Sequence, residues 1–256
     1  MKIRLGVKVW STNLSLIAEA QRIFDDGKLD YVEVFCVPDS VGDTAARWAE
    51  SHLPLIVHAP HSAAGLNFSN PDQEARNIVL ASESLQMADI LHADTVIFHP
   101  GIGGSLEETI RQIRPLTDAR MILENKPYRG LDGSYCIGSN PAEMVELTES
   151  LGIGFCLDFG HAIAAANSYK EPIEEFILRF LALKPRMYHL TDGELASELD
   201  HHNRYGEGSF PLRELLSYVP TGARVTDEAM RTDPNSLNEY VHDRDYAVRL
   251  LEGGAL

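Results

Sequence analysis

Three things are scarce in this sequence of 256 residues: cysteine, basic residues and long apolar runs. The three cysteines are odd in number and widely spaced, which favours a reducing cytoplasm over a disulfide scaffold. No stretch of about 18 uncharged apolar residues occurs, so we expect no transmembrane segment and no membrane partner. The first residues run directly into a strand pattern and lack the features of a signal peptide.

Lys and Arg together number 22, against 38 Asp and Glu, and the formal net charge is −16. Such a charge opposes non-specific binding to nucleic acids and anionic membranes. The loop between Pro60 and Pro71 contains no Lys or Arg. The few cations near the candidate site are Lys8, Lys126, Arg129, Arg204 and Arg231. A bound metal ion can still supply strong local positive charge, so an anionic substrate is not excluded.

Apolar runs alternate with helical patterns along the whole chain and predict eight strand–helix repeats. The predicted strands are residues 3–10, 31–37, 55–59, 95–99, 120–125, 153–158, 186–190 and 223–226. The predicted helices are residues 14–24, 42–51, 71–91, 105–116, 141–151, 173–183, 211–218 and 236–251. We expect Ser11 or Thr12 to cap the first helix. Residues 126–139 and 191–208 are expected to form loops.

The predicted strands are mostly continuous apolar runs, which are typical of parallel sheets buried on both faces. Eight repeats in a chain of this length indicate a (β/α)₈ TIM barrel, with apolar content of 44% to fill its core. A doubly wound open sheet is the competing architecture, but it does not explain why ligand-type residues close successive strands. We find no linker or low-complexity segment and expect one domain over residues 1–256.

Most predicted strands end in an imidazole or a carboxylate. The clearest case is the apolar run 153–157, which is followed by Asp158-Phe159-Gly160-His161. The C-terminal strand ends of a barrel form its catalytic face, so these side chains should meet there. The candidates are His58, His61, His99, Glu124, Asp158, His161, His189, Asp192, Asp200, His201, His202 and Glu228. One such histidine alone is more often a hydrogen-bonded core residue; the convergence of the whole set predicts metal binding.

Imidazole and carboxylate groups are ligands for zinc, manganese and iron. One ion uses three or four protein groups, so this set predicts two or three ions. We expect Zn²⁺, with Mn²⁺ or Mg²⁺ as alternatives. A carboxylate such as Glu124 is expected to bridge two of the ions.

A set of motifs in residues 55–229 resembles the endonuclease IV family (AP endonuclease family 2) of the xylose isomerase-like TIM barrel superfamily. The motifs are His58, Phe98-His99-Pro100-Gly101, Leu123-Glu124-Asn125, Leu157-Asp158-Phe159-Gly160-His161-Ala162, Tyr188-His189-Leu190-Thr191-Asp192, Asp200-His201-His202-Asn203-Arg204-Tyr205-Gly206-Glu207-Gly208 and Asp227-Glu228. Asp200-x-His202 followed by Gly206-x-Gly208 is among the more discriminating parts. An Asp-x-x-His motif alone is shared with sugar isomerases and epimerases.

The resemblance implies a trinuclear zinc site. The first ion would be held by His58, His99 and Glu124. The second would be held by Glu124, Asp158, His189 and Glu228, and the third by His161, Asp200 and His202. Two metals about 3.5–4 Å apart can activate a water and stabilise the leaving oxygen of a phosphoryl displacement. Glu124 would fix the metal spacing, and Glu228 would orient the attacking water.

The resemblance therefore implies a phosphoester hydrolase that cleaves abasic-site DNA or a smaller phosphate ester. Asn125, Asp192 and Glu207 would orient the imidazoles. Leu66 and Phe68 are possible wedges for a DNA duplex, although such residues more often pack their own loop.

The alternative function is a sugar isomerase or epimerase that uses one Mn²⁺ or Mg²⁺. In that case Glu124, Asp158, His189 and Glu228 hold the ion, and Glu124 and Glu228 move protons next to a carbonyl. Trp10, Phe35 and Phe68 would stack on the sugar. A third possibility is a non-catalytic metal-binding or ligand-binding barrel. It is disfavoured because such a protein has no structural need for so many ligand-type residues at the catalytic face. The number of bound metals separates the first two functions.

Overall fold

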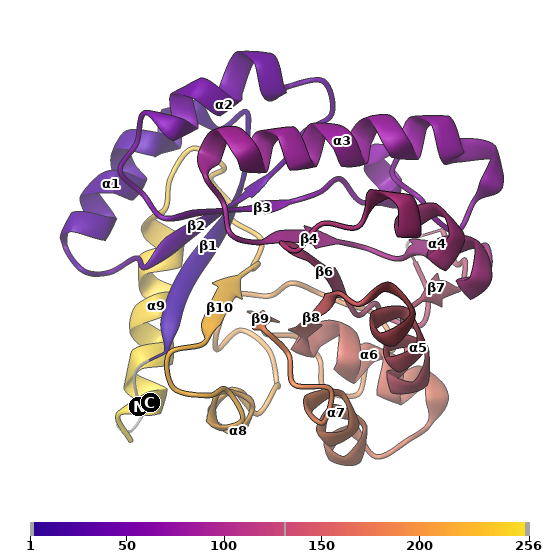
Figure 1. Cartoon of the computed structure of the whole chain (residues 1–256). Helices are drawn as coiled ribbons and strands as arrows, with labels where there is room; N and C mark the ends of the chain where they lie inside the picture. Colours follow the sequence, from indigo (N-terminus) through magenta and orange to yellow (C-terminus); the bar gives the residue numbers. More distant parts are fainter. Residues whose placement is uncertain (1–2, 131, 254–256) are drawn as a thin grey trace.

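The computed structural model describes residues 3–130 and 132–253, in which eight parallel strands close into a barrel (Figure 1). The barrel order is β1-β10-β9-β8-β6-β4-β3-β2. These strands are β1 (Arg4–Trp10), β2 (Tyr31–Phe35), β3 (Leu55–His58), β4 (Val96–Phe98), β6 (Met121–Glu124), β8 (Gly154–Asp158), β9 (Met187–Leu190) and β10 (Arg224–Asp227). The predicted (β/α)₈ barrel is therefore confirmed.

Helices surround the barrel, as Figure 1 shows for the long α3 beside β3 and β4. The α-helices are α1 (Ile17–Asp25), α2 (Val41–Ala49), α3 (Glu74–Leu91), α4 (Leu106–Ile113), α5 (Pro141–Leu151), α6 (Phe159–Tyr169), α7 (Ile173–Leu181), α8 (Leu212–Ser217) and α9 (Asn238–Leu251). Short 3₁₀ turns lie at η1 (Leu14–Leu16), η2 (Ser62–Ala64), η3 (Pro71–Gln73) and η4 (Arg114–Leu116). Within the described ranges, none of these helices has both the length and the apolarity that crossing a membrane requires.

Helix α6 was not predicted from the sequence. It starts directly after the sixth predicted strand, and its residues 159–166 are all buried. A helix that is buried on every side has no polar face and lacks the periodic pattern that reveals a surface helix. The Asp158 carboxylate caps it by accepting a hydrogen bond from the His161 backbone N–H. The motif Asp158-Phe159-Gly160-His161 is thus a strand end joined directly to a helix start.

Two other predictions need correction. Residues 126–139 were expected to be a loop, but β7 (Cys136–Ile137) pairs antiparallel with β5 (Gly101–Ile102). Neither Ser11 nor Thr12 caps the first helix; Asn13 precedes η1, and its side chain accepts a hydrogen bond from the Trp10 N–H instead. The single domain over residues 1–256 stays a prediction, and residues 1–2, 131 and 254–256 lie outside the described ranges.

Candidate metal centre

Inward-pointing side chains of the barrel form two layers. The lower layer is a separate buried cluster of Tyr31, Ile56, Ile97, Ile122, Cys156 and Met187. Two residues further along the chain from each of these stand Glu33, His58, His99, Glu124, Asp158 and His189. Side chains at i and i+2 of a strand point to the same face, so this upper layer also faces the interior. It lies toward the C-terminal strand ends, where barrel enzymes place their active sites.

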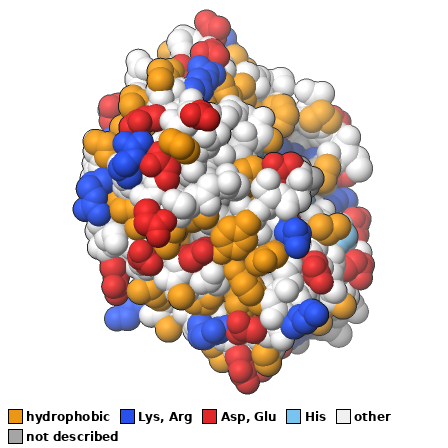
Figure 2. Space-filling model, turned by 90° about the vertical axis from the view of Figure 1, so that its right-hand side faces the viewer, with side chains coloured by type: hydrophobic (Ala, Val, Ile, Leu, Met, Phe, Trp, Pro, Cys, Tyr) orange, Lys and Arg blue, Asp and Glu red, His pale blue; other side chains and the backbone are white. Residues whose placement is uncertain are grey.

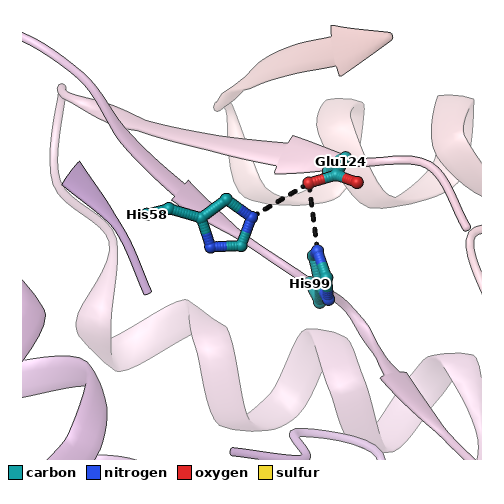
Figure 3. A group of neighbouring side chains, drawn as sticks. All are labelled: His58, His99 and Glu124. Carbon is teal, nitrogen blue, oxygen red and sulfur yellow. Dashed lines mark hydrogen bonds and ion pairs between the residues drawn. The ribbon is translucent and has the colours of Figure 1, made fainter. Parts of the chain in front are cut away.

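The first group of the upper layer is His58, His99 and Glu124, which point toward one another in Figure 3. The Nε2 atoms of His58 and His99 lie 3.1 Å and 3.0 Å from the same oxygen, Glu124 Oε2. His58 Nδ1 is 2.6 Å from the Ala59 carbonyl, which only accepts hydrogen bonds. The ring proton of neutral His58 is therefore on Nδ1, and the Nε2 lone pair faces the group.

A second group, His161, Asp200 and His202, lies beside the first. Asp200 Oδ2 is 3.2 Å from His161 Nε2 and 2.6 Å from His202 Nε2. The Nδ1 atoms of the two histidines lie 2.9 Å from the backbone carbonyls of Asn125 and Glu228 respectively. Both rings are therefore held by their Nδ1–H groups, and both Nε2 atoms are directed at one carboxylate.

The remaining predicted ligands connect these two groups. His189 Nδ1 is 2.9 Å from Glu228 Oε1, 3.4 Å from Glu124 Oε2 and 4.0 Å from Asp158 Oδ2. Glu124 Oε1 lies 3.0 Å from His161 Nδ1, so Glu124 contacts residues of both histidine groups. All nine residues predicted as metal ligands thus converge at the barrel mouth. Their role as ligands stays a prediction.

The imidazole nitrogens and carboxylate oxygens of the centre are arranged as ligands for cations more than as hydrogen-bond partners of one another. Among the described residues, Glu33 Oε1, Glu124 Oε1 and His189 Nδ1 are buried without a hydrogen-bond partner. Buried polar atoms without partners are costly, and they cluster here on atoms that point into one space. Several imidazole nitrogens and carboxylate oxygens face the same space, and Lys8 and Lys126 border it at 2.8 Å from Glu228 Oε1 and 3.4 Å from His161 Nε2. This arrangement suits divalent metal ions.

The acid–base balance of the centre reflects the same crowding of charge. Burial opposes ionisation of Glu124, yet the neighbouring His99 and His189 hold its pKa well below the ordinary value. Burial alone would lower the pKa of His161, but Asp158 and Asp200 raise it to about 10. Burial likewise disfavours charge on His202, whereas Asp200 raises its pKa to about 9. In the absence of metal, protonated imidazoles therefore neutralise the carboxylates.

Of the residues expected to orient the imidazoles, only Asn125 does so. Its backbone carbonyl accepts from His161, and its side chain bonds the backbone of Asp158 in both directions. Asp192 instead accepts the backbone N–H groups of Gly193, Gly206, Gly208 and Phe210, and so folds the loop that carries Asp200 and His202. Glu207 is exposed. The prediction for Asp192 was wrong because backbone N–H groups occupy its carboxylate, and among the described residues no hydrogen bond joins Glu207 to an imidazole.

Four other candidates lie outside the ligand groups. His61 stacks on His99 and lies tilted against Phe35, and His201 Nε2 is 2.8 Å from Ser197 Oγ. Leu66 and Phe68 are 1% and 0% exposed, so they pack the loop and are not placed as wedges. The Phe68 ring contacts Phe98 in the core, which also rules out stacking on a sugar.

Two residues at the centre were missed as site residues by sequence reasoning. Glu33 lies in the middle of β2, and Lys8 pairs with it in register on β1. Lys8 Nζ is 2.8 Å from Glu228 Oε1 and 3.9 Å from Glu33 Oε1. The sequence did carry a signal: each residue is a charged side chain inside a mostly apolar strand. Each also follows by two positions a residue that faces the barrel interior, Gly6 before Lys8 and Tyr31 before Glu33. The sequence analysis looked for ligand-type residues at the strand ends and therefore gave neither residue a role in the site.

Three exposed apolar residues lie near the centre. Among the described residues, the three most exposed large hydrophobic side chains are Trp10, Leu199 and Met230, at 62%, 62% and 71%. Leu199 precedes Asp200, and the Met230 N–H bonds the His202 carbonyl. The Trp10 ring lies 6.5 Å from Phe35, which in turn lies 5.7 Å from His58. All three residues therefore lie on chain segments next to residues of the ligand groups.

A closed barrel with an imidazole- and carboxylate-rich centre at its C-terminal mouth defines a (β/α)₈ protein with a candidate metal centre. A family model described as xylose isomerase-like TIM barrel matches residues 28–220. The chain belongs to this family.

Curated relatives include probable endonuclease 4 proteins. The one from Thermoplasma volcanium is 28% identical over 180 residues, covering 64% of this chain and 62% of that protein. The one from Symbiobacterium thermophilum is 26% identical over 239 residues, covering 84% of each. Among solved structures, endonuclease IV from Thermus thermophilus gives a TM-score of 0.67 at 19% identity over 98% of both chains. A D-tagatose 3-epimerase-like protein gives 0.70 at 18% identity over 97% of both. These structural similarities concern the fold alone.

Proposed function

We propose that this protein is a metal-dependent phosphoester hydrolase of the endonuclease IV type. The observation that carries the proposal is the separate group of His161, Asp200 and His202 next to Glu124. A single-ion isomerase site needs no more than four protein ligands and gives no role to a second organised group. The endonuclease 4 relatives support the same choice.

In this proposal the first ion is held by His58, His99 and Glu124, the second by Glu124, Asp158, His189 and Glu228, and the third by His161, Asp200 and His202. Zinc is the expected metal, because imidazole and carboxylate ligands suit it, with manganese or magnesium as alternatives. When bound, such ions would supply Lewis acidity to a phosphoryl group and lower the pKa of an attacking water.

The protein's own groups define where the reaction would occur. Glu124 sets the spacing of the centre, because its two oxygens face different histidine groups. Glu228 is the proposed orienting group for the attacking water, since its carboxylate lies at the open side beside Lys8. The Lys8 side chain is 18% exposed. Burial lowers the pKa of Lys8, but the negative charges of Glu228 and Glu33 outweigh this effect and raise the pKa above its ordinary value. Lys8 would therefore present a permanent positive charge to the substrate phosphate.

We favour a small phosphate ester over duplex DNA as substrate. The net charge is −16, and on the face shown in Figure 2 the Lys and Arg side chains are scattered among acidic and hydrophobic ones. Tight binding to a duplex needs many phosphate contacts from Lys and Arg. Leu66 and Phe68, the possible wedges, are buried. Trp10, Leu199 and Met230 instead offer an apolar surface for the organic part of an ester.

The second candidate function is a single-metal sugar isomerase or epimerase. One observation favours it: Glu124, Asp158, His189 and Glu228 are gathered around one point, as that function requires. Of its three proposed stacking residues, however, Phe35 and Phe68 are buried, and only Trp10 is widely exposed.

The direct test offers the purified, zinc-loaded protein a bis-aryl phosphodiester, an abasic-site duplex and a ketose sugar. We expect hydrolysis of the small ester, loss of activity with a chelator and recovery with zinc. Glu228→Gln should reduce turnover by at least about 10²-fold, on the order of the contribution of a general base. Epimerisation of the ketose without ester hydrolysis would replace the proposal with the second function. Efficient duplex incision would reverse our preference for a small substrate.

A further inference from the structure

We propose that Glu33 is a positioning residue that orients His189 and places its ring proton on Nε2, so that Nδ1 is the metal-facing atom. The inference deepens the proposed metal-dependent function and rests on it. Glu33 is absent from the ligand set that the sequence motifs imply. Its contacts, however, are made with the centre and with nothing outside the barrel.

The contact between Glu33 and His189 crosses the barrel interior. Glu33 lies on β2 and His189 on β9, and β1 and β10 separate these strands in the sheet. Glu33 Oε2 is 3.0 Å from His189 Nε2, and both side chains are fully buried. A carboxylate accepts hydrogen bonds and does not donate them, so the proton between the two atoms belongs to Nε2. The lone pair of neutral His189 is then on Nδ1.

The position of His189 Nδ1 agrees with this assignment. This buried atom lies 2.9 Å from Glu228 Oε1, close enough to share a proton with it in the metal-free protein, and a bound ion would take the place of that proton. It therefore points at the carboxylates of the proposed second ion, while Nε2 points away from them. A ligating imidazole usually donates its other N–H to an acceptor that fixes the ring. Glu33 meets this description for His189.

The other imidazoles of the centre show why a side chain is needed here. His58, His161 and His202 each donate their second N–H to a backbone carbonyl near the barrel mouth. His189 Nε2 instead faces the interior of the barrel, where backbone carbonyls are engaged in the strand ladder. Glu33, three strands away around the barrel, is the carboxylate that reaches it.

Glu33 is itself held in place from below. Its Oε2 accepts a 2.7 Å hydrogen bond from Thr226 Oγ1, and the Tyr31 hydroxyl lies 2.8 Å from the same Thr226 oxygen. Because Thr226 donates its proton to Glu33, Tyr31 must donate to Thr226. The Tyr31 ring lies directly over Gly6, where a Cβ would collide with it. Tyr31, Thr226, Glu33 and His189 therefore form one directed chain.

Glu33 is better explained as a positioning residue than as a further ligand. Glu33 also lies close to His58 and Glu228, with one side-chain donor atom of each within 4.8 Å of the others. That side of the centre already holds the Lys8 ammonium, 2.8 Å from Glu228 and 3.9 Å from Glu33. The other oxygen of Glu33, Oε2, is already occupied by the His189 Nε2–H and the Thr226 hydroxyl. Lys8 thus neutralises Glu33 on one side while His189 and Thr226 bond it on the other.

The test compares zinc affinity of the full chain for Glu33→Gln, with Thr226→Val as the matched variant in the same chain of bonds. We expect Glu33→Gln to weaken one zinc site by about 10- to 100-fold, while saturating zinc still gives the wild-type stoichiometry. Thr226→Val should weaken it less, because the Glu33–His189 bond remains. Affinity within twofold of wild type for Glu33→Gln, or a reduced saturating stoichiometry, would overturn the inference.

A second measurement needs no variant. Side-chain ¹H–¹⁵N correlation spectra of the zinc-loaded wild type should show His189 protonated at Nε2 and ligated at Nδ1. His58, His161 and His202 should show the opposite tautomer. The same tautomer for all four would contradict the role of Glu33, even if Glu33→Gln failed to fold. Both readouts concern metal binding, so a protein that binds zinc as described but cleaves no ester would refute only the proposed function.

Discussion

His202 Nε2 lies 2.6 Å from Asp200 Oδ2, and His202 reaches this position in a left-handed backbone conformation with φ of 51°. Residues other than glycine rarely adopt this conformation, which costs free energy and is found at functional sites. Its neighbour His201 instead bonds Ser197. The backbone of the loop thus directs one histidine of the pair to the centre and the other away from it.

This difference predicts distinct effects on metal content. His202→Ala should lower the bound metal by one ion per chain, because it removes one of three ligands from the outer group. His201→Ala is the matched control and should keep the full content. Both are measured by elemental analysis of the purified proteins. If His202→Ala binds as many metal ions per chain as the wild type, the protein has no third ion at His161, Asp200 and His202.

The metal-free protein should lose stability as pH rises. The pKa of His161 is raised to about 10 and that of His202 to about 9, from 6.5. Groups with raised pKa values stabilise the fold fully below about pH 6.5 and lose this contribution as pH passes through 9 and 10. The free energy of unfolding of the chelated protein should therefore fall between pH 7 and 10.

Zinc should suppress this pH dependence, because ligated imidazoles are already neutral. Denaturant titrations at several pH values, with chelator or with zinc, measure both effects. In the chelated protein, His202→Gln should flatten the curve. A chelated wild type whose stability rises over the same interval would contradict the charge assignments.

Asp192 supports a prediction about the loop. Its carboxylate accepts four backbone N–H groups, from Gly193, Gly206, Gly208 and Phe210. Asp192→Asn turns one acceptor into a donor, so at least one buried N–H loses its partner at a cost of about 1–3 kcal/mol. We expect faster proteolysis within residues 193–210 and weaker binding of the outer ion, with the other sites preserved. Unchanged proteolysis would show that the loop is held by other contacts.

Trp10 supports a prediction about substrate binding. Trp10→Ala should raise KM for an aryl phosphate ester by about 2- to 10-fold, since an aromatic contact contributes about 0.5–1.5 kcal/mol. Turnover at saturation and metal content should stay near wild type. Ile78→Ala, an exposed position on α3, is the control. A KM that does not change would place the substrate away from this rim.

Much of the fold was predictable because most barrel strands are apolar runs, and six of the eight predicted strands end at or next to a ligand-type residue. The same regularity brought all nine predicted ligands to one mouth, since parallel strand ends meet there. Helix α6 was not predictable, because its buried faces remove the amphipathic pattern. Glu33 was passed over, and Lys8 was named only as a cation near the site, because their roles depend on contacts between strands far apart in the sequence. Asp192 was misassigned because loop backbone groups, invisible in the sequence, claimed its carboxylate.

The central claim is that one cluster of ions joins the two histidine groups through Glu124. The most direct measurement is anomalous scattering at the zinc edge from crystals of the zinc-loaded protein. The account predicts three peaks at the barrel mouth, one among His58, His99 and Glu124, one beside His189 and Glu228, and one among His161, Asp200 and His202. A single peak beside His189, with no metal in the other two ligand groups, would contradict the claim of a three-ion cluster.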